Sequence, residues 1–209
     1  MYKRQLVDLA AQSSEFTATA QRHLLDVYEA QRDWSAAVAI AEALIASAES
    51  EGQSAAGQGQ PAPQLRGHYL CEQAEAAVAS GDQAAARALY EQALRDRPRD
   101  LRALMGLVRC ALEAGDATLA MEYFHRVMDS ERRCTPEMLD LLRTICAAQV
   151  DPSLYMTSLE RYYDQQHSPL LALALAAELS LLEGREPADD FLRGSVSYTH
   201  LTLPTTPYV

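Results

Sequence analysis

The chain has 209 residues and a formal charge of −11, from 29 acidic against 18 basic side chains, and it contains no cluster of Lys and Arg that would follow a phosphate backbone. This balance disfavours nucleic acid as a partner. Hydrophobic residues make up 48% of the chain, with only three Phe and one Trp, which favours helices packed closely on small side chains over strands.

The apolar segments are too short for a membrane helix. The longest run, from Leu170 to Leu182, contains Glu178 and is well below the roughly 20 residues that a span requires. No apolar core follows Lys3-Arg4, so the N-terminus does not have the pattern of a signal peptide. We therefore expect a soluble segment with no membrane contact of its own.

The cysteines are spaced too widely for a familiar motif. Their positions are Cys71, Cys110, Cys134 and Cys146, which form neither a CxxC pair nor the framework of a small secreted protein. We expect reduced thiols in a cytoplasmic protein, since free cysteine is commonly buried there.

The two ends of the chain share an unusual relation at the level of DNA. Residues 1–5 can be encoded by a string whose reverse complement encodes Val-Ser-Tyr-Thr, the sequence that begins at Val196. Such an inverted repeat resembles translated sequencing adapter. We therefore expect residues 1–5 and 196–209 to be non-native and the gene fragment between them to be truncated on both sides; ordinary flexible termini are the alternative. Codons incompatible with the inverted repeat would refute this hypothesis.

A period of 34 residues runs through the middle of the chain. Ser80-Gly81-Asp82 recurs as Ala114-Gly115-Asp116, with small and aromatic residues at matching distances after each. This pattern resembles the tetratricopeptide repeat (TPR), a helix hairpin that stacks on its neighbours because one hairpin cannot bury its own apolar face. We predict an all-α TPR helix-hairpin solenoid over residues 6–195, a right-handed superhelix of four to five helix pairs.

Three copies of the hairpin can be aligned on this period. Small residues such as Ala86 and Ala120 are expected where two helices cross, because closely spaced axes leave no room for a branched side chain. A weaker first copy contains Trp34 and Ala37, and it is separated from the second by a segment rich in Gly, Ser, Gln, Ala and Pro. We expect that segment, about 49–64, to be a flexible inserted loop.

Three further helix starts follow the repeats. Each combines a side-chain oxygen with a following Pro, the residue types preferred at the N-cap and at the first helical position: Thr135-Pro136, Asp151-Pro152 and Ser168-Pro169. Gly184 is expected to end the last of these helices, and Pro187 to begin another.

The order of these segments resembles one protein family. The residues that carry the resemblance are Asp33-Trp34, His68-Tyr69 with Cys71-Glu72, and Met105-Gly106-Leu107-Val108. They are similar to the central repeats of the lipopolysaccharide assembly protein B (LapB) family, over about residues 15–195. The repeat positions themselves are shared with many TPR proteins.

The resemblance implies a function for the parent protein. Members of that family are anchored in the inner membrane, facing the cytoplasm, and promote degradation of the deacetylase LpxC by the membrane protease FtsH, which regulates lipopolysaccharide biosynthesis. They end in a rubredoxin-like domain whose CxxC pairs bind metal. This sequence has neither the anchor nor those pairs, so we expect no cofactor and no metal site in it. The suspected partners are FtsH and LpxC.

The candidate binding residues come from the repeat frame. In TPR arrays the first helix of each pair lines the concave face, and we expect a mixed-charge client there, with Met105 and Leu112 as apolar contacts and Arg102 and Arg109 as ion-pair donors. The full set is Arg22, Asp26, Glu29, His68, Glu75, Arg102, Met105, Arg109 and Leu112, with Cys71 and Val78 on the same face. The alternative is that these residues are only solvated helix faces.

No catalytic residues are predicted. His68 near Cys71 would suit a thiolate pair, but nucleophilic catalysis also needs an oriented base and an oxyanion site, and the sequence indicates neither. The remaining histidines stand singly. We therefore favour a non-catalytic adaptor, with a generic protein-interaction scaffold for another client as the alternative and an enzyme as the less favoured class.

Overall fold

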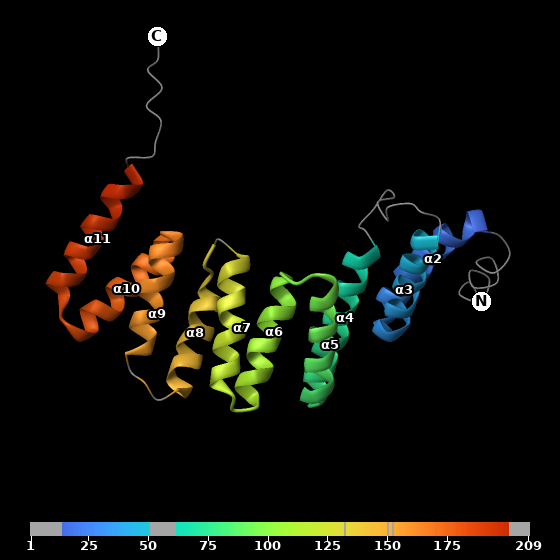
Figure 1. The fold of residues 1–209 in the computed structure, drawn as a ribbon, viewed down its shortest axis with the longest axis horizontal. Helices are drawn as coiled ribbons and strands as arrows, with labels where there is room; N and C mark the ends of the chain where they lie inside the picture. Colours follow the sequence, from blue (N-terminus) through green and yellow to red (C-terminus); the bar gives the residue numbers. More distant parts are fainter. Residues whose placement is uncertain (1–13, 51–61, 132, 150, 152, 201–209) are drawn as a thin grey trace, which may run out of the picture. The chain divides into compact units, whose positions relative to one another are not determined.

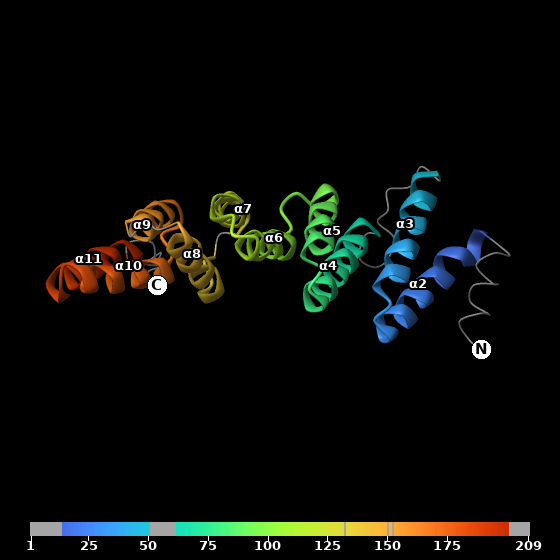
Figure 2. The same ribbon diagram turned by 90° about the horizontal axis from the view of Figure 1, so that it is seen from below.

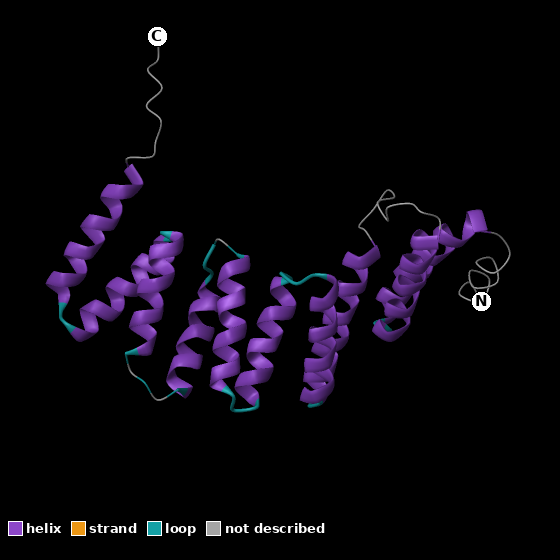
Figure 3. Ribbon diagram, viewed as in Figure 1, coloured by secondary structure: helices purple, strands orange, loops and turns teal. Residues whose placement is uncertain are grey.

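A computed structural model describes residues 14–50, 62–131, 133–149, 151 and 153–200 of the chain. All regular structure in these ranges is helical (Figures 1 and 3). The helices are α2 (Ser14–Gln31), α3 (Trp34–Ser50), α4 (Ala62–Ser80), α5 (Gln83–Asp96), α6 (Leu101–Glu113), α7 (Ala117–Ser130), α8 (Pro136–Ala148), α9 (Leu154–Gln166), α10 (Pro169–Leu182) and α11 (Arg185–His200). The predicted all-α fold of helix pairs is confirmed, whereas the handedness of a superhelix stays a prediction.

The chain forms two compact units, residues 1–110 and 111–209, and their boundary lies within α6. In the first unit α2 packs on α3, α3 on α4, and α4 on α5. In the second, α7 packs on α8, α8 on α9, α9 on α10, and α10 on α11. Two perpendicular views both show α4 beside α5 as an antiparallel hairpin (Figures 1 and 2).

The repeated Gly-Asp pair builds the turn inside a hairpin. Gly81 adopts φ 84° and donates its N–H to the Val78 carbonyl, and the Asp82 N–H donates to the Ala77 carbonyl. This pair of hydrogen bonds is a Schellman motif, and it ends α4. The Asp82 carboxylate then accepts from the Ala85 N–H and caps α5. Gly115 and Asp116 make the same bonds in the second unit, so the 34-residue period is a period of turn geometry.

The small residues of the repeat frame lie where the frame predicts. Ala37, Ala74, Ala86 and Ala120 are all fully buried. Gly106 on α6 has a further role, because a Cβ added there would lie 2.6 Å from the Cε1 and Cε2 atoms of Tyr90. The ring of α5 therefore packs directly on the backbone of α6.

The Pro-based helix starts are confirmed at two places and wrong at one. α8 begins at Pro136, with the Thr135 hydroxyl accepting from the Met138 N–H. α10 begins at Pro169 with Ser168 at its N-cap, but the Ser168 side chain makes no capping hydrogen bond. α9 does not begin after Asp151 but at Leu154. The reason is that the Asp151 carboxylate bonds to the N–H and hydroxyl of Ser153, which holds a separate turn ahead of the helix.

Two predicted boundaries also change. α3 continues to Ser50 and α4 begins at Ala62, so the inserted loop is shorter than 49–64, and residues 51–61 lie outside the described ranges. Pro63 in the first turn of α4 is tolerated there because its missing N–H needs no partner. α11 starts at Arg185, before Pro187, and its backbone stays helical to His200, since the first Pro of the tail is Pro204. Residues 1–5 and 201–209 lie outside the described ranges.

Candidate functional site

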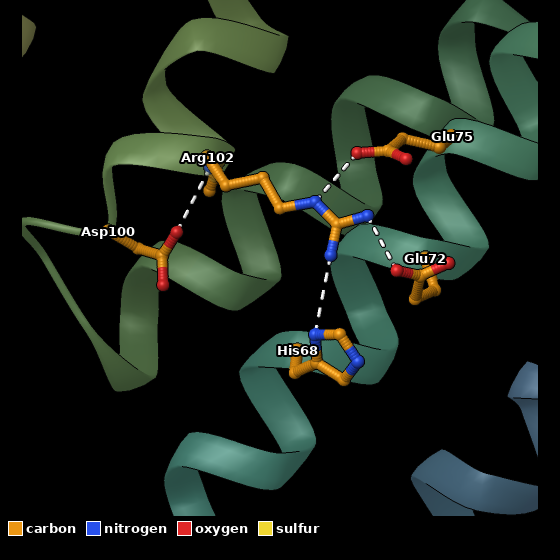
Figure 4. Close-up of polar contacts among 6 residues, drawn as sticks. His68, Glu72, Glu75, Asp100 and Arg102 are labelled. Atoms are coloured by element: carbon orange, nitrogen blue, oxygen red, sulfur yellow. Dashed lines mark hydrogen bonds and ion pairs between the residues drawn. The ribbon is translucent and has the colours of Figure 1, made fainter. Parts of the chain in front are cut away.

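The candidate site is a charged cluster on two first helices of the hairpins, α4 and α6. Arg102 stands 34 residues after His68, at the same repeat position, so the two side chains are neighbours across the stacked hairpins. Glu72 and Glu75 lie on the same side of α4, one and two turns beyond His68. Figure 4 shows the Arg102 guanidinium reaching from α6 to all three side chains. We call these four residues the Arg102 cluster.

Each nitrogen of the Arg102 guanidinium has its own partner. Nε donates to Glu75 Oε1 at 2.7 Å, and Nη2 donates to Glu72 Oε1 at 2.7 Å. Nη1 lies 3.3 Å from His68 Nδ1. The hydrogen bond to Arg102 lowers the pKa of Glu75 and outweighs the opposing effect of burial. The cluster is therefore a set of charge-assisted bonds at the surface between two hairpins.

The N-terminus of α6 is fixed next to this cluster. The Asp100 carboxylate accepts from the Ala103 N–H at 3.1 Å and caps the helix (Figure 4). Capping sets where α6 begins and so places Arg102 in its first turn, opposite α4.

A second polar contact ties α2 to α4. The Tyr69 hydroxyl donates to Glu29 Oε1 at 2.6 Å, and its ring stacks on Trp34 with 6.4 Å between centroids. Burial, followed by the bond to Glu29, raises the pKa of Tyr69 above its ordinary range, so the phenol stays protonated. Glu29 and the Arg102 cluster thus lie on three neighbouring first helices, whose charged side we call the client face: Arg22, Asp26, Glu29, His68, Glu72, Glu75, Arg102 and Arg109.

The structure corrects the predicted exposure of two apolar side chains on this face. Met105 has only 8% of its surface exposed, and Cys71, at the same position one repeat earlier, has 1%. Both side chains are therefore buried and are not surface contacts for a client, because burial of apolar surface away from water is favourable. Arg102 is predicted as an ion-pair donor to a client, and that role stays a prediction; within the chain its guanidinium pairs with Glu72 and Glu75.

The other predicted residues are more accessible. Arg22, Asp26, Glu29, His68, Glu75 and Arg109 are exposed, and Leu112 is half-buried in the second unit. Sequence reasoning missed Glu72 and Tyr69 as members of the site. The 34-residue period could have identified Glu72. It pairs Arg102 with His68 on the neighbouring first helix, and Glu72 lies one turn from His68 on that helix.

The structure does not favour a thiolate at Cys71 next to His68. Burial raises the pKa of the Cys71 thiol to about 12, so it stays protonated near neutrality and His68 does not activate it. Within the described ranges no three His, Cys, Asp or Glu side chains gather in a metal-binding arrangement. Across the part of the chain that the structure describes, no helix is long and apolar enough to cross a membrane.

A family model for the tetratricopeptide repeat matches residues 71–130, which run from α4 to the end of α7. The repeat turns at Gly81 and Gly115 and the cluster residues Glu72, Glu75 and Arg102 all lie within this match.

The repeat region is similar to that of lipopolysaccharide assembly protein B. The relatives from Escherichia coli K12, O6:H1 (CFT073) and O157:H7 are each 24% identical over 180 residues, which is 86% of this chain and 43% of theirs. The chain therefore spans less than half the length of the curated relatives it matches. A crystal structure of BtubC (BKLC) from P. vanneervenii aligns over 99% of this chain and 91% of that one, with a TM-score of 0.44 and 13% identity.

Proposed function

We propose that this chain is a non-catalytic scaffold that binds a protein client on the client face of α2, α4 and α6. The observation that carries the proposal is the Arg102 cluster, since it places charges of both signs, already ordered by mutual bonds, on the exposed side of consecutive TPR first helices. Ordered charges lose less side-chain entropy on binding than mobile ones do. A scaffold of this kind requires no cofactor.

The similarity to lipopolysaccharide assembly protein B suggests the identity of the client. By that similarity, the parent protein would act at the cytoplasmic side of the inner membrane and bring LpxC to the protease FtsH, regulating lipopolysaccharide biosynthesis. The support is the 24% identity over 86% of the chain. The alternative is a scaffold for a different client, which the low identity keeps open.

Binding of the full chain to purified LpxC and to the cytoplasmic part of FtsH, measured by isothermal titration calorimetry, tests both parts. The charge reversal Arg109→Glu on the client face should weaken binding by about 5- to 10-fold, since a face-exposed charge contributes to complementarity. Arg185→Glu is the matched control, because this exposed arginine lies on α11 in the second unit.

The outcomes separate the two claims. Unchanged affinity in Arg109→Glu, or an equal loss in Arg185→Glu, would refute the client face. No binding of either protein to the wild-type chain would refute the LpxC and FtsH assignment.

A further inference from the structure

We propose that the outer face of α10 is a dimerisation surface for a second copy of this chain, on which the two α10 helices cross in antiparallel directions. Three residues define the face, Leu173, Ala177 and Leu181, and we call them the α10 stripe. The proposal concerns a different helix from those of the client face, and it does not depend on LpxC or FtsH.

The helix α10 is apolar on two opposite sides. It packs on α9 and on α11 (Figure 1). Its buried residues are Leu171, Ala172, Leu175 and Ala176. The α10 stripe has the i, i+4, i+8 spacing of a single helix face, and this face lies opposite to the buried one. Leu173 is nevertheless 60% exposed and Leu181 79%. Because a helix with apolar residues on all sides is normally buried on all sides, the stripe indicates an interaction surface.

Stacking of a further hairpin would not cover most of the stripe. The counterparts of the stripe on α6, two periods of 34 residues earlier, are Met105, Arg109 and Glu113. Arg109 and Glu113 are exposed, although further hairpins follow α6 in the chain. Only Met105 is buried. A hairpin placed after α10 would therefore cover Leu173 but leave Ala177 and Leu181 open.

The order of the side chains favours a second copy as the partner. Leu173, Ala177 and Leu181 are spaced equally and read the same in both directions. Two antiparallel copies therefore bring Ala177 against Ala177, and Leu173 against Leu181 on each side of it. A small residue at the crossing point lets two helix axes approach to about 8 to 10 Å, while the flanking leucines fill the grooves. The result is a closed dimer with two-fold symmetry.

The charges at the two ends of α10 agree with the antiparallel direction. The Ser168 side chain at the N-cap makes no capping hydrogen bond, so it does not neutralise the partial positive charge of the helix N-terminus. Glu183, directly after the helix, is exposed. In a pair centred on Ala177 this carboxylate lies beside the first turn of the other α10. A parallel pair would instead place the two glutamates next to each other.

The size of the stripe predicts a weak dimer. The open surface of Leu173 and Leu181, with that of Ala177 and the half-buried Leu170, is on the order of 250 Å² per copy. Two copies would bury on the order of 500 Å², well below the roughly 1,200 Å² of a stable complex. We therefore expect a dissociation constant of about 0.1 to 1 mM.

Substitutions at the centre of the stripe test the proposal. Ala177→Glu introduces the residue that α4 carries at the equivalent position, Glu75, so a repeat helix accommodates it. Ala177→Lys introduces the opposite charge. Because residue 177 meets itself across the two-fold axis, each variant should repel its own copy. Ala76→Glu is the matched control, since it makes the same change at an exposed position of α4 in the first unit.

Sedimentation equilibrium of the full chain between about 10 µM and about 1 mM covers the expected range. The average mass of the wild type should rise with concentration from that of one chain toward that of two. Ala177→Glu and Ala177→Lys should each weaken association by at least about 10-fold, and Ala76→Glu should behave as the wild type. An equimolar mixture of Ala177→Glu and Ala177→Lys should associate at least as strongly as the wild type, which also shows that both variants fold.

The opposite results would overturn the proposal. They are a wild type that stays monomeric at about 1 mM, association that persists in Ala177→Glu, and an equal loss in Ala76→Glu. A mixture that does not recover association would overturn the crossing at Ala177. Binding of LpxC or of phosphatidylglycerol vesicles to a monomeric wild type, weakened by Ala177→Glu, would assign the stripe to a client or to lipid and so overturn the dimer as well.

Discussion

The α2/α3 hairpin and the α4/α5 hairpin have the same turn but reach it with different residues. In the α4/α5 hairpin Gly81 adopts φ 84°, and in the α2/α3 hairpin Arg32 adopts φ 53° at the equivalent position. The backbone hydrogen bonds are also equivalent: the Arg32 N–H donates to the Glu29 carbonyl, and the Asp33 N–H donates to the Tyr28 carbonyl. A side chain in the left-handed region costs about 1 kcal/mol. The comparison shows that backbone bonds and the Asp cap define the turn, and that Gly only lowers its cost.

The two hairpins also differ in what the next helix offers them. Trp34 of the first hairpin stacks on the Tyr69 ring of α4, so that joint is made of two side chains that can adjust. Tyr90 of the second hairpin packs on the backbone of α6 at Gly106. A helix backbone cannot adjust its position as a side chain can. The second joint should therefore tolerate substitution less than the first.

The largest effect should come from Gly106→Ala. The added methyl group would overlap the Tyr90 ring and force the hairpins apart, at a cost of about 3 kcal/mol in the free energy of unfolding, measured by urea denaturation. Gly67→Ala on α4 is the matched control, because its nearest neighbour would be 3.9 Å away, and it should stabilise by about 0.5 kcal/mol through helix propensity.

A double mutant sharpens that test. Tyr90→Leu removes the ring atoms that the methyl group would meet, so Gly106→Ala should cost clearly less in its presence. Strictly additive losses would show that the ring and the glycine do not form one joint.

The next effect should be the loss of a cap. Asp82→Ala and Asp33→Ala each remove a carboxylate that accepts an N–H at the start of the following helix, and each should cost about 1 kcal/mol in the same denaturation assay. Equal losses in the two hairpins would support a common turn. A loss confined to Asp82→Ala would mean that the Arg32 turn is held differently.

The residue at positive φ should respond in opposite directions in the two hairpins. Gly81→Ala should destabilise by about 1 kcal/mol, because Ala is strained in the left-handed region, while Arg32→Gly should stabilise by about 0.5 kcal/mol. The stabilisation is smaller because Gly also adds entropy to the unfolded chain. Thermal unfolding followed by circular dichroism measures both, and a destabilising Arg32→Gly would contradict the comparison.

The smallest effect concerns the ion pair that α4 makes with the next hairpin. Because the pKa of Glu75 is lowered in the folded chain, its bond to Arg102 stabilises the fold above the ordinary carboxyl range and is lost as pH falls. Glu75→Gln should therefore cost about 0.5 kcal/mol near neutrality, and this cost should shrink as pH falls and the carboxylate of Glu75 is protonated in the folded chain. Glu91→Gln, in an exposed pair within α5, is the control, and a pH-independent loss in Glu75→Gln would contradict the linkage.

The sequence predicted the fold well where one local rule decides the outcome. The period at Gly81 and Gly115 located the turns, and buried Ala86 and Ala120 follow from helix crossing alone. The start of α9 was wrong because Asp151 has two competing uses, a cap or a separate turn, and spacing does not distinguish them.

The candidate site was harder to predict because it depends on side chains from different hairpins. The repeat frame placed His68, Glu75 and Arg102 on one face. It did not show that the Arg102 guanidinium donates hydrogen bonds to Glu72 and Glu75. Nor does the frame show that Met105 faces inward. These properties are set by contacts between repeats, which a pattern within one repeat does not contain.

The buried cysteines are native probes of hairpin opening, so no reactive residue has to be introduced. Cys71, Cys110 and Cys146 are buried on α4, α6 and α8, and burial raises the pKa of Cys71 to about 12. An alkylating reagent therefore reacts with each sulfur only during an excursion that exposes its helix. Mass spectrometry of the modified peptides would give one opening rate per helix and show whether the array frays from its ends or breaks at an internal joint.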